Sequence, residues 1–190
     1  MEAFLVSAVV VAVSEIGDKT QLLSLFLAAR FRRPLPIILG ICGATVLNHG
    51  IAGAVGTWLH DALSPDVLRW MLAASFLAIA GWALLPDSLD EEKAPAERYG
   101  VFVVTLIAFF LAEIGDKTQI ATTVLAARHG ALIAVVGGST LGMLCVDVPS
   151  VLVGSALPSA IPLRALRIAG AGLFGALAAA TLFGIQLAPA

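Results

Sequence analysis

The sequence predicts an all-α, polytopic membrane protein with six transmembrane helices in a 3+3 inverted repeat. Three observations lead to this prediction: the composition, the number of long apolar segments and a heptapeptide that occurs twice. Of the 190 residues, 59% are hydrophobic and 13% are charged, and the mean hydropathy is +0.99. Soluble domains average about 45–50% apolar and about 25% charged residues. The net charge of −2 also argues against a nucleic-acid-binding protein, which would carry a basic patch.

Six segments are long and apolar enough to cross a bilayer, which takes about 20 mainly apolar residues. Prolines and charged residues separate them, as in Arg-Arg-Pro at 32–34 and the charged run at 87–98. The first segment follows Glu2 and no Lys or Arg, so we expect a retained span and not a cleaved signal peptide. The six segments are residues 3–29, 35–59, 67–86, 100–127, 131–157 and 164–187.

The heptapeptide Glu-Ile-Gly-Asp-Lys-Thr-Gln occurs at residues 15–21 and again at residues 113–119. A shift of 98 residues matches 11 of 16 positions between 15–30 and 113–128, and it aligns Gly40 with Gly138. We therefore expect a three-helix unit at 1–86, an acidic cytoplasmic linker at 87–98 and a second unit at 99–190. Because three helices are an odd number, the second unit enters the membrane from the opposite side. Such inverted repeats are typical of secondary transporters.

The positive charges predict the orientation, since Lys and Arg collect in cytoplasmic loops. Seven of them fall in loops on one side of the predicted topology and two on the other. This places both termini outside the cytoplasm and the 87–98 linker inside, as a solvated connector or, alternatively, a cation-attracting or regulatory segment. The richer side holds Arg30, Arg32, Arg33, Lys93, Arg98, Arg164 and Arg167, and the poorer side holds Arg69 and Arg128.

Each heptapeptide places carboxylates in the middle of an apolar segment. Glu15 and Glu113 are each about 18 Å from the start of their segment at about 1.5 Å per residue. Ionisable groups at that depth mark functional sites. On a continuous helix, Glu15 shares a face with Asp18, and Glu113 shares a face with Asp116.

If the first and fourth helices meet, these four carboxylates converge on one site that only a cation or protons can stabilise. Oxygen ligands suit hard divalent ions such as Ca²⁺, Mn²⁺ and Mg²⁺, whereas no cysteine or histidine pair accompanies the motif to favour zinc or copper. The carboxylates can accept protons when the metal leaves, as a cation/proton antiporter requires. Further candidate metal ligands lie in or near the motifs: Thr20, Gln21, Thr118, Gln119 and Asp147.

Other motif residues have two interpretations. Lys19 and Lys117 follow the glutamates by four residues, so ion pairs Glu15–Lys19 and Glu113–Lys117 are the structural alternative to a metal site. The glycines Gly17 and Gly115 allow either local unwinding or close helix contact. We place the lysines outside the ligand set, as neutralising charges.

Outside the motif, the repeat aligns His49 with Asp147. Asp147 is a fifth carboxylate in an apolar segment, and His49 titrates near neutral pH when unperturbed. Together with Glu15 and Glu113 they are our candidates for proton coupling. For His49 and its neighbour Asn48, hydrogen bonding between helices is the alternative that we favour.

The duplicated motif resembles that of the GDT family of Ca²⁺/Mn²⁺:proton exchangers, through Glu15–Thr20 and Glu113–Thr118 and over essentially the whole chain. The resemblance implies an antiporter whose metal ligands are Glu15, Asp18, Glu113 and Asp116. In a bacterial member it implies export of Mn²⁺. The chain lacks the N-terminal extension of organellar members, so we expect a multi-pass protein of the bacterial inner (plasma) membrane. The expected partners are the transported Mn²⁺ or Ca²⁺, protons and lipid, with no separate cofactor.

Three other functions compete with this prediction. An exporter of a small organic solute would need a pocket of mixed donors, and a cation channel would lack alternating access. An enzyme is disfavoured because no HExxH or GxSxG motif is present in the sequence. Small residues in the last segment predict close internal packing, with a homo-oligomer contact as the alternative.

Overall fold

The structure, a computed structural model, describes residues 1–83, 100–153 and 163–183. These residues form eight α-helices and no strand, so the predicted all-α class is confirmed. The 87–98 linker lies outside the described residues. The helices are α1 (Glu2–Glu15), α2 (Lys19–Phe31), α3 (Pro34–Ala62), α4 (Pro65–Ala83), α5 (Val101–Glu113), α6 (Lys117–His129), α7 (Leu132–Val153) and α8 (Leu163–Leu182).

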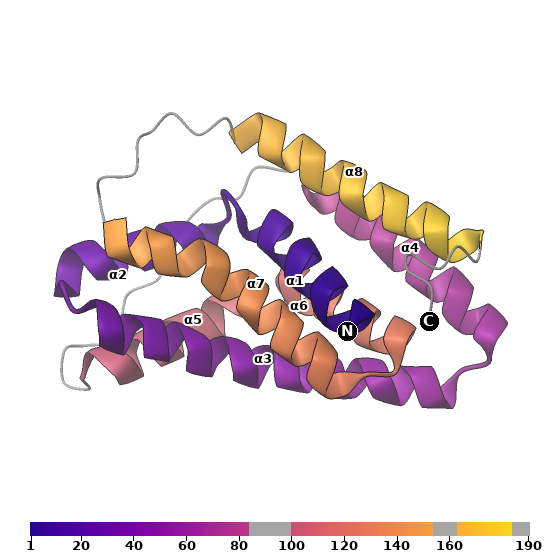
Figure 1. The fold of residues 1–190 in the computed structure, drawn as a ribbon, viewed down its shortest axis with the longest axis horizontal. Coiled ribbons are helices and arrows are strands. Elements are labelled where there is room, and N and C mark those ends of the chain that lie inside the picture. Colours follow the sequence, from indigo (N-terminus) through magenta and orange to yellow (C-terminus); the bar gives the residue numbers. More distant parts are fainter. Residues whose placement is uncertain (84–99, 154–162, 184–190) are drawn as a thin grey trace.

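Proline and glycine set several of the helix boundaries. Pro34 and Pro65 begin α3 and α4, at a position where the missing N–H is not needed for an intrahelical hydrogen bond. At the other end of a helix, α6 stops at Gly130, whose φ of 61° turns the chain out of the helix. These signals make the connections α3–α4 and α6–α7 short, and the chain reverses direction at both (Figure 1).

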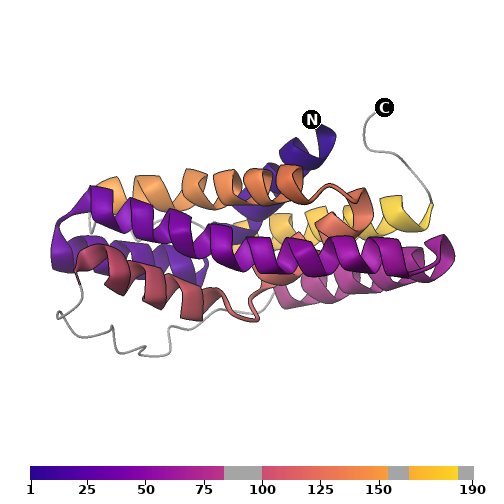
Figure 2. The same ribbon diagram turned by 90° about the horizontal axis from the view of Figure 1, so that it is seen from below.

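The helices form an elongated bundle in which α3 runs most of the length (Figures 1 and 2). At one end of the bundle lie α2 and α5, and at the other end α4 and α8 lie side by side. The main packing partners are α1 with α7, α3 with α5, α3 with α6, and α4 with α8. The long helices α3 and α7 thus each pack on the first helix of the opposite half of the chain.

Two aligned glycines make these contacts close. A Cβ at Gly40 of α3 would lie 2.9 Å from the carbonyl oxygen of Phe102 in α5. A Cβ at Gly138 of α7 would collide with the carbonyl oxygen of Phe4 in α1. Because both the glycines and their partners are related by the 98-residue shift, the two halves pack on each other through equivalent contacts.

The apolar side chains gather in two clusters on either side of the molecular centre. The larger cluster joins α1, α4, α6, α7 and α8 around Phe76 and Leu125, and the smaller one joins α2, α3, α5 and α7 around Leu27 and Phe109. The connections α1–α2 and α5–α6 lie between these clusters, near the middle of the molecule (Figure 1). Both connections belong to the repeated heptapeptides.

The first and fourth predicted segments are not continuous helices. Residues 3–29 divide into α1 and α2, and residues 100–127 divide into α5 and α6, in both cases at the Ile-Gly of the motif. The other four predicted segments each correspond to one helix, namely α3, α4, α7 and α8. Sequence hydropathy missed the breaks because the residues that form them are few and the apolar pattern resumes beyond them.

Two of the described helices are long and apolar enough to cross a membrane, Pro34–Ala62 and Leu132–Leu152. A shorter apolar helix is Val101–Glu113, which stops where the motif begins. The helix breaks leave α1, α2, α5 and α6 with 14, 13, 13 and 13 residues, so none of them alone reaches the length of about 20 residues that a span needs.

Candidate cation site at two helix breaks

The two motifs form the same backbone turn. In the first, Ile16 has φ −63° and ψ 117°, and Gly17 has φ 81°. In the second, Ile114 has φ −60° and ψ 120°, and Gly115 has φ 74°. The N–H of each aspartate donates to the carbonyl of the glutamate three residues before it, at 3.0 Å in both copies. These are the dihedral angles and the hydrogen bond of a type II β-turn.

The glycine of each motif is explained by this turn. A type II turn needs a positive φ at its third residue, a conformation that costs other residues about 1–2 kcal/mol. A Cβ added at Gly115 would meet no atom within 4 Å, so close helix contact does not account for this glycine. Of the two interpretations of the glycines, local unwinding is therefore confirmed.

The turn also corrects the expected relation between glutamate and aspartate. Glu15 is the last residue of α1, whereas Asp18 is the N-cap of α2, and Glu113 and Asp116 have the same places in α5 and α6. The prediction that each pair shares a face of one continuous helix is wrong, because the helix ends between them. Each glutamate lies at the C-terminal end of one helix, and its aspartate lies at the N-terminal end of the next helix. At such ends, backbone carbonyl and N–H groups lack partners within the helix.

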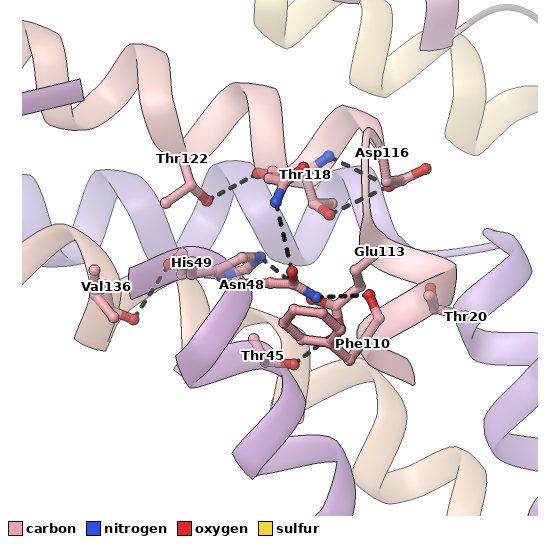
Figure 3. A network of polar contacts seen from close by, with 12 residues as sticks. Thr20, Thr45, Asn48, His49, Phe110, Glu113, Asp116, Thr118, Thr122 and Val136 are labelled. Carbon is pink, nitrogen blue, oxygen red and sulfur yellow. Dashed lines mark hydrogen bonds and ion pairs between the residues drawn. The ribbon is translucent and has the colours of Figure 1, made fainter. Parts of the chain in front are cut away.

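Each aspartate lies at a helix N-terminus, where the helix dipole stabilises negative charge. The Oδ2 atom of Asp116 accepts hydrogen bonds from the backbone N–H and the hydroxyl of Thr118, at 3.3 and 3.2 Å (Figure 3). The Oδ2 atom of Asp18 accepts one from the Thr20 hydroxyl at 3.5 Å. The motif threonines therefore hold the aspartates in place.

The motif glutamines stabilise the turns by hydrogen bonds and connect them to neighbouring helices. The backbone N–H of Gly17 donates to Gln21 Oε1 at 2.8 Å, and that of Gly115 donates to Gln119 Oε1 at 2.7 Å. Gln21 Nε2 donates to the hydroxyl of Ser150 in α7 at 3.1 Å. The amide of Gln119 lies 3.5 Å from the side-chain oxygen of an asparagine of α3. Both glutamines thus link their turn to the long helix that passes beside it.

The lysines join one motif to the other. Lys117 Nζ donates to Asp18 Oδ1 in a buried ion pair, and Lys19 Nζ is 3.6 Å from Asp116 Oδ1. These pairs run between the motifs, whereas the structural alternative supposed pairs of Glu with Lys inside each motif. The lysine side chains differ in exposure, 6% for Lys117 and 31% for Lys19. Each aspartate is thereby partly neutralised by the opposite half of the chain.

Glu113 is fully buried and well supplied with hydrogen-bond donors (Figure 3). Its Oε1 accepts from the Thr45 hydroxyl at 3.0 Å, and its Oε2 accepts from Asn48 Nδ2 at 3.4 Å. The ring of His49 places Nε2 3.9 Å from the same Oε2, while its Nδ1 shares a 2.9 Å hydrogen bond with Ser139 of α7. The expected interhelical hydrogen bonding of Asn48 and His49 is confirmed.

Glu15 is equally buried but has no such donors. Neither of its carboxylate oxygens has a hydrogen-bond partner, and the same is true of Asp147 in α7. The carboxylates of Asp147, Asp18, Asp116 and Glu113 all lie close enough to Glu15 to repel a charge on it. The structure therefore gathers all five candidate carboxylates in one electrostatically connected region.

The distribution of polar and apolar side chains is reversed relative to a soluble protein. Large apolar residues lie on the outside, among them Leu35, Trp58 and Ile133, which are 65%, 66% and 86% exposed. Hydroxyl, amide and charged side chains lie inside, including Ser7, Ser14, Thr105, Thr122 and Thr140 in addition to the site residues. A soluble protein rarely exposes so much large apolar surface while it buries charges.

The metal-ligand set and the proton-coupling set remain predictions. In the described part of the chain, no three His, Cys, Asp or Glu side chains are placed to hold one metal ion. The sequence also did not identify Thr45 as a neighbour of Glu113. A signal was present, because Thr45 precedes Asn48 and His49 by three and four residues and so shares their helix face.

Comparisons with known proteins agree with the resemblance of the motif. The family model of the divalent cation/proton antiporter GDT1 matches residues 3–91 and 101–187. A Vibrio cholerae protein named "Putative manganese exporter" is 52% identical over 184 residues, which are 96% of this chain and 92% of the relative. No solved structure matches the chain.

More distant relatives occur in plants. "GDT1-like protein 3" of Oryza sativa subsp. indica is 30% identical over 201 residues, covering 91% of this chain and 71% of the relative. "GDT1-like protein 5" of Arabidopsis thaliana is 26% identical over 224 residues, covering 98% and 95%. With both halves matched by the family model, the chain belongs to the GDT1 family of divalent cation/proton antiporters.

Proposed function

We propose that this member of the GDT1 family is a secondary antiporter that exports Mn²⁺ in exchange for protons, with Ca²⁺ as the alternative cation. The observation that carries the proposal is the pair of type II turns, which bring Glu15, Asp18, Glu113 and Asp116 into the buried centre of a protein with an apolar exterior. The name of the Vibrio cholerae relative supports manganese as the exported metal.

The proposed architecture has six membrane spans in two inverted units of three. The first span consists of α1 and α2 and the fourth of α5 and α6, so each is interrupted at its centre by a motif turn. Interrupted helices near the midplane are a recurring feature of transporter sites, since their free backbone ends can face an ion. In the proposed orientation the protein is a multi-pass protein of the inner membrane, with both termini outside the cytoplasm.

In the proposed mechanism the motif carboxylates bind the cation and protons in alternation. The two glutamates bind the cation in different conformations of the cycle, and each ends its helix beside carbonyls that the helix C-terminus leaves free. Carbonyl and carboxylate oxygens are the ligands of hard divalent ions. When the cation leaves, protonation of the carboxylates removes the repulsion among them. Coupling follows because the same oxygens cannot hold a cation and protons at once.

The lysines adjust the charge of the site. Lys19 and Lys117 each face an aspartate of the opposite motif, which lowers the net negative charge that a divalent cation must balance. These ion pairs also join the two halves of the chain directly across the centre. Alternating access requires a movement of one half against the other, and such a movement changes the charge at the site because it separates these ion pairs.

A transport assay tests this function. The purified protein is reconstituted in liposomes that contain a pH-sensitive dye, and Mn²⁺ or Ca²⁺ is added outside. We expect saturable metal uptake with release of protons from the lumen, faster with Mn²⁺ than with Ca²⁺. Metal flux without proton movement would indicate a channel, and no flux with either ion would contradict the proposal.

Matched variants connect the flux to the motif. Glu15→Gln and Glu113→Gln should each reduce coupled transport to the rate of empty liposomes, because each removes a buried acidic group. Asp66→Asn is the control, since Asp66 is a carboxylate that is 86% exposed in the first turn of α4. Wild-type rates in both glutamate variants would show that the motif is not the transport site.

A further inference from the structure

We propose that the two copies of the site are unequal and that, in this conformation, the divalent cation binds between Glu15 and Asp147 while Glu113 is not a ligand. The proposal rests on the function proposed above and specifies where the cation is held. It assigns a direct binding role to Asp147, which lies on α7 and outside both motifs.

The first step is the difference between the helices that face the two glutamates. On α3, three donor groups reach Glu113 or lie close to it, from Thr45, Asn48 and His49. The 98-residue shift places Met143, Val146 and Asp147 at the aligned positions of α7. Two donors are thus replaced by buried apolar side chains, and the histidine is replaced by a carboxylate.

The second step is the state of the acidic groups. Both oxygens of Glu15 and both oxygens of Asp147 are buried and lack hydrogen-bond partners, and the two side chains are 0% exposed. A buried carboxylate without partners costs several kcal/mol, and a second one beside it adds repulsion. Glu113, by contrast, has both oxygens engaged by neutral donors. The site that gains most from a cation is therefore Glu15 with Asp147.

The third step concerns the positive charges that could otherwise balance the pair. The two motif lysines are engaged with Asp18 and Asp116, so the aspartates already have cationic partners.

The chemistry of the pair suits a hard divalent cation. Two carboxylates offer up to four oxygens, and Mg²⁺ and Mn²⁺ are commonly held by one or two carboxylates and water. The pair comes from α1 and α7, which pack along each other, so the cation would connect the two halves of the chain. The motif glutamate of the second half, Glu113, is instead fixed by α3 of the first half.

Equilibrium binding of Mn²⁺ to the detergent-purified full chain tests the assignment without transport. Free Mn²⁺ is measured by electron paramagnetic resonance during a titration. We expect Asp147→Asn and Glu15→Gln to weaken binding at least about tenfold, which corresponds to about 1.4 kcal/mol. Glu113→Gln should change the Kd less than about threefold, or about 0.7 kcal/mol. Asp66→Asn is again the control, as an exposed aspartate that loses the same charge.

The conservative variant Asp147→Glu separates a ligand from a structural residue. It keeps a carboxylate on α7, so Mn²⁺ binding should be restored to within about tenfold of wild type, whereas a residue needed only for packing would tolerate the isosteric asparagine better than the longer glutamate. A variant is titrated only if it elutes as a single monodisperse species and unfolds in a cooperative thermal transition, which shows that it is folded. The opposite order of affinities, asparagine above glutamate, would overturn the assignment.

The outcomes also distinguish this inference from the proposed function. If wild-type protein exchanges Mn²⁺ for protons but Asp147→Asn binds Mn²⁺ as tightly as wild type, only the inference fails. If Glu113→Gln weakens binding as much as Glu15→Gln, the site is symmetric and the inference again fails. If wild-type protein binds Mn²⁺ at Asp147 but moves no protons in liposomes, the inference stands as a binding site and the antiport function fails.

Discussion

The turn at residues 15–18 and the turn at residues 113–116 have the same sequence and the same backbone, yet their surroundings differ. Both glycines have a positive φ, and both aspartates begin a helix. At the first turn, however, Glu15 has no hydrogen-bond donor, whereas at the second turn Glu113 has two. The lysine of the second motif is also more deeply buried than that of the first.

This comparison shows that the motif determines the backbone conformation of the site, whereas the neighbouring helices determine which polar and charged groups surround each glutamate. The type II turn follows from local residues, since only glycine adopts its third position without strain. The donors and carboxylates around each glutamate come from α3 or α7, where the two halves of the chain have diverged. The two motif helices also differ in their neighbours, since α6 packs against α3 and α4, whereas α2 packs mainly against α7.

The largest expected effect concerns the two lysines. Lys117→Met should lower the free energy of unfolding by about 3–5 kcal/mol, because it leaves Asp18 charged and buried without this partner. Lys19→Met should cost about 0–1 kcal/mol, since the Lys19 side chain is partly exposed and its pair with Asp116 is longer. Thermal unfolding in detergent measures both. Equal losses of stability in the two variants would show that the two ion pairs are equivalent and would contradict the difference between the two motifs.

The two glutamates should differ in the sign of their effect on stability. Without metal, Glu15→Gln should stabilise the protein, because it removes a buried acidic group that has no hydrogen-bond partner and lies near Asp147. Glu113→Gln should destabilise it by about 1–3 kcal/mol, because it disturbs two hydrogen bonds that contribute about 0.5–1.5 kcal/mol each. Unfolding is followed in a metal chelator and then with Mn²⁺, which should raise the Tm of Glu113→Gln but not of Glu15→Gln. A shift in the same direction for both variants would contradict the unequal sites.

The glycines should show what the two turns share. Gly115→Ala should cost about 1–2 kcal/mol from backbone strain alone, because the added Cβ meets no atom within 4 Å. Gly50→Ala is the matched control inside α3, where a Cβ also has open space, and it should stabilise by about 0.5–1 kcal/mol. Thermal unfolding distinguishes the two, and a neutral Gly115→Ala would argue against the type II turn.

The smallest effect is expected at the glutamines. Gln21→Met and Gln119→Met remove the hydrogen bond to the turn glycine, at a cost of about 0.5–1.5 kcal/mol each. The Gln21 variant should cost slightly more, because Gln21 donates to Ser150 at 3.1 Å whereas the second contact of Gln119 is 3.5 Å long. Thermal unfolding of both variants shows which substitution lowers the stability more. The reverse order would show that the long Gln119 contact is the stronger one.

Much of the fold could be predicted from the sequence, because it depends on local signals. The apolar segments, their prolines and the 98-residue repeat predicted the all-α class and the place of α3, α4, α7 and α8. The breaks in the first and fourth segments could not be located, since glycine allows several conformations and hydropathy averages over a whole segment. The glycine of each motif was correctly singled out, but its two interpretations could be separated only by the φ angle and the open space at Gly115.

By itself, the sequence determined which groups are placed in an apolar environment and that they occur in two equivalent sets. It did so because covalent spacing and hydropathy are properties of the chain alone. Only the tertiary structure decided the partners: Lys117 with Asp18 and not with its own glutamate, and donors beside Glu113 but a second carboxylate beside Glu15. Such pairs join residues about 65 to 130 positions apart, and their strength depends on burial, which local sequence does not encode.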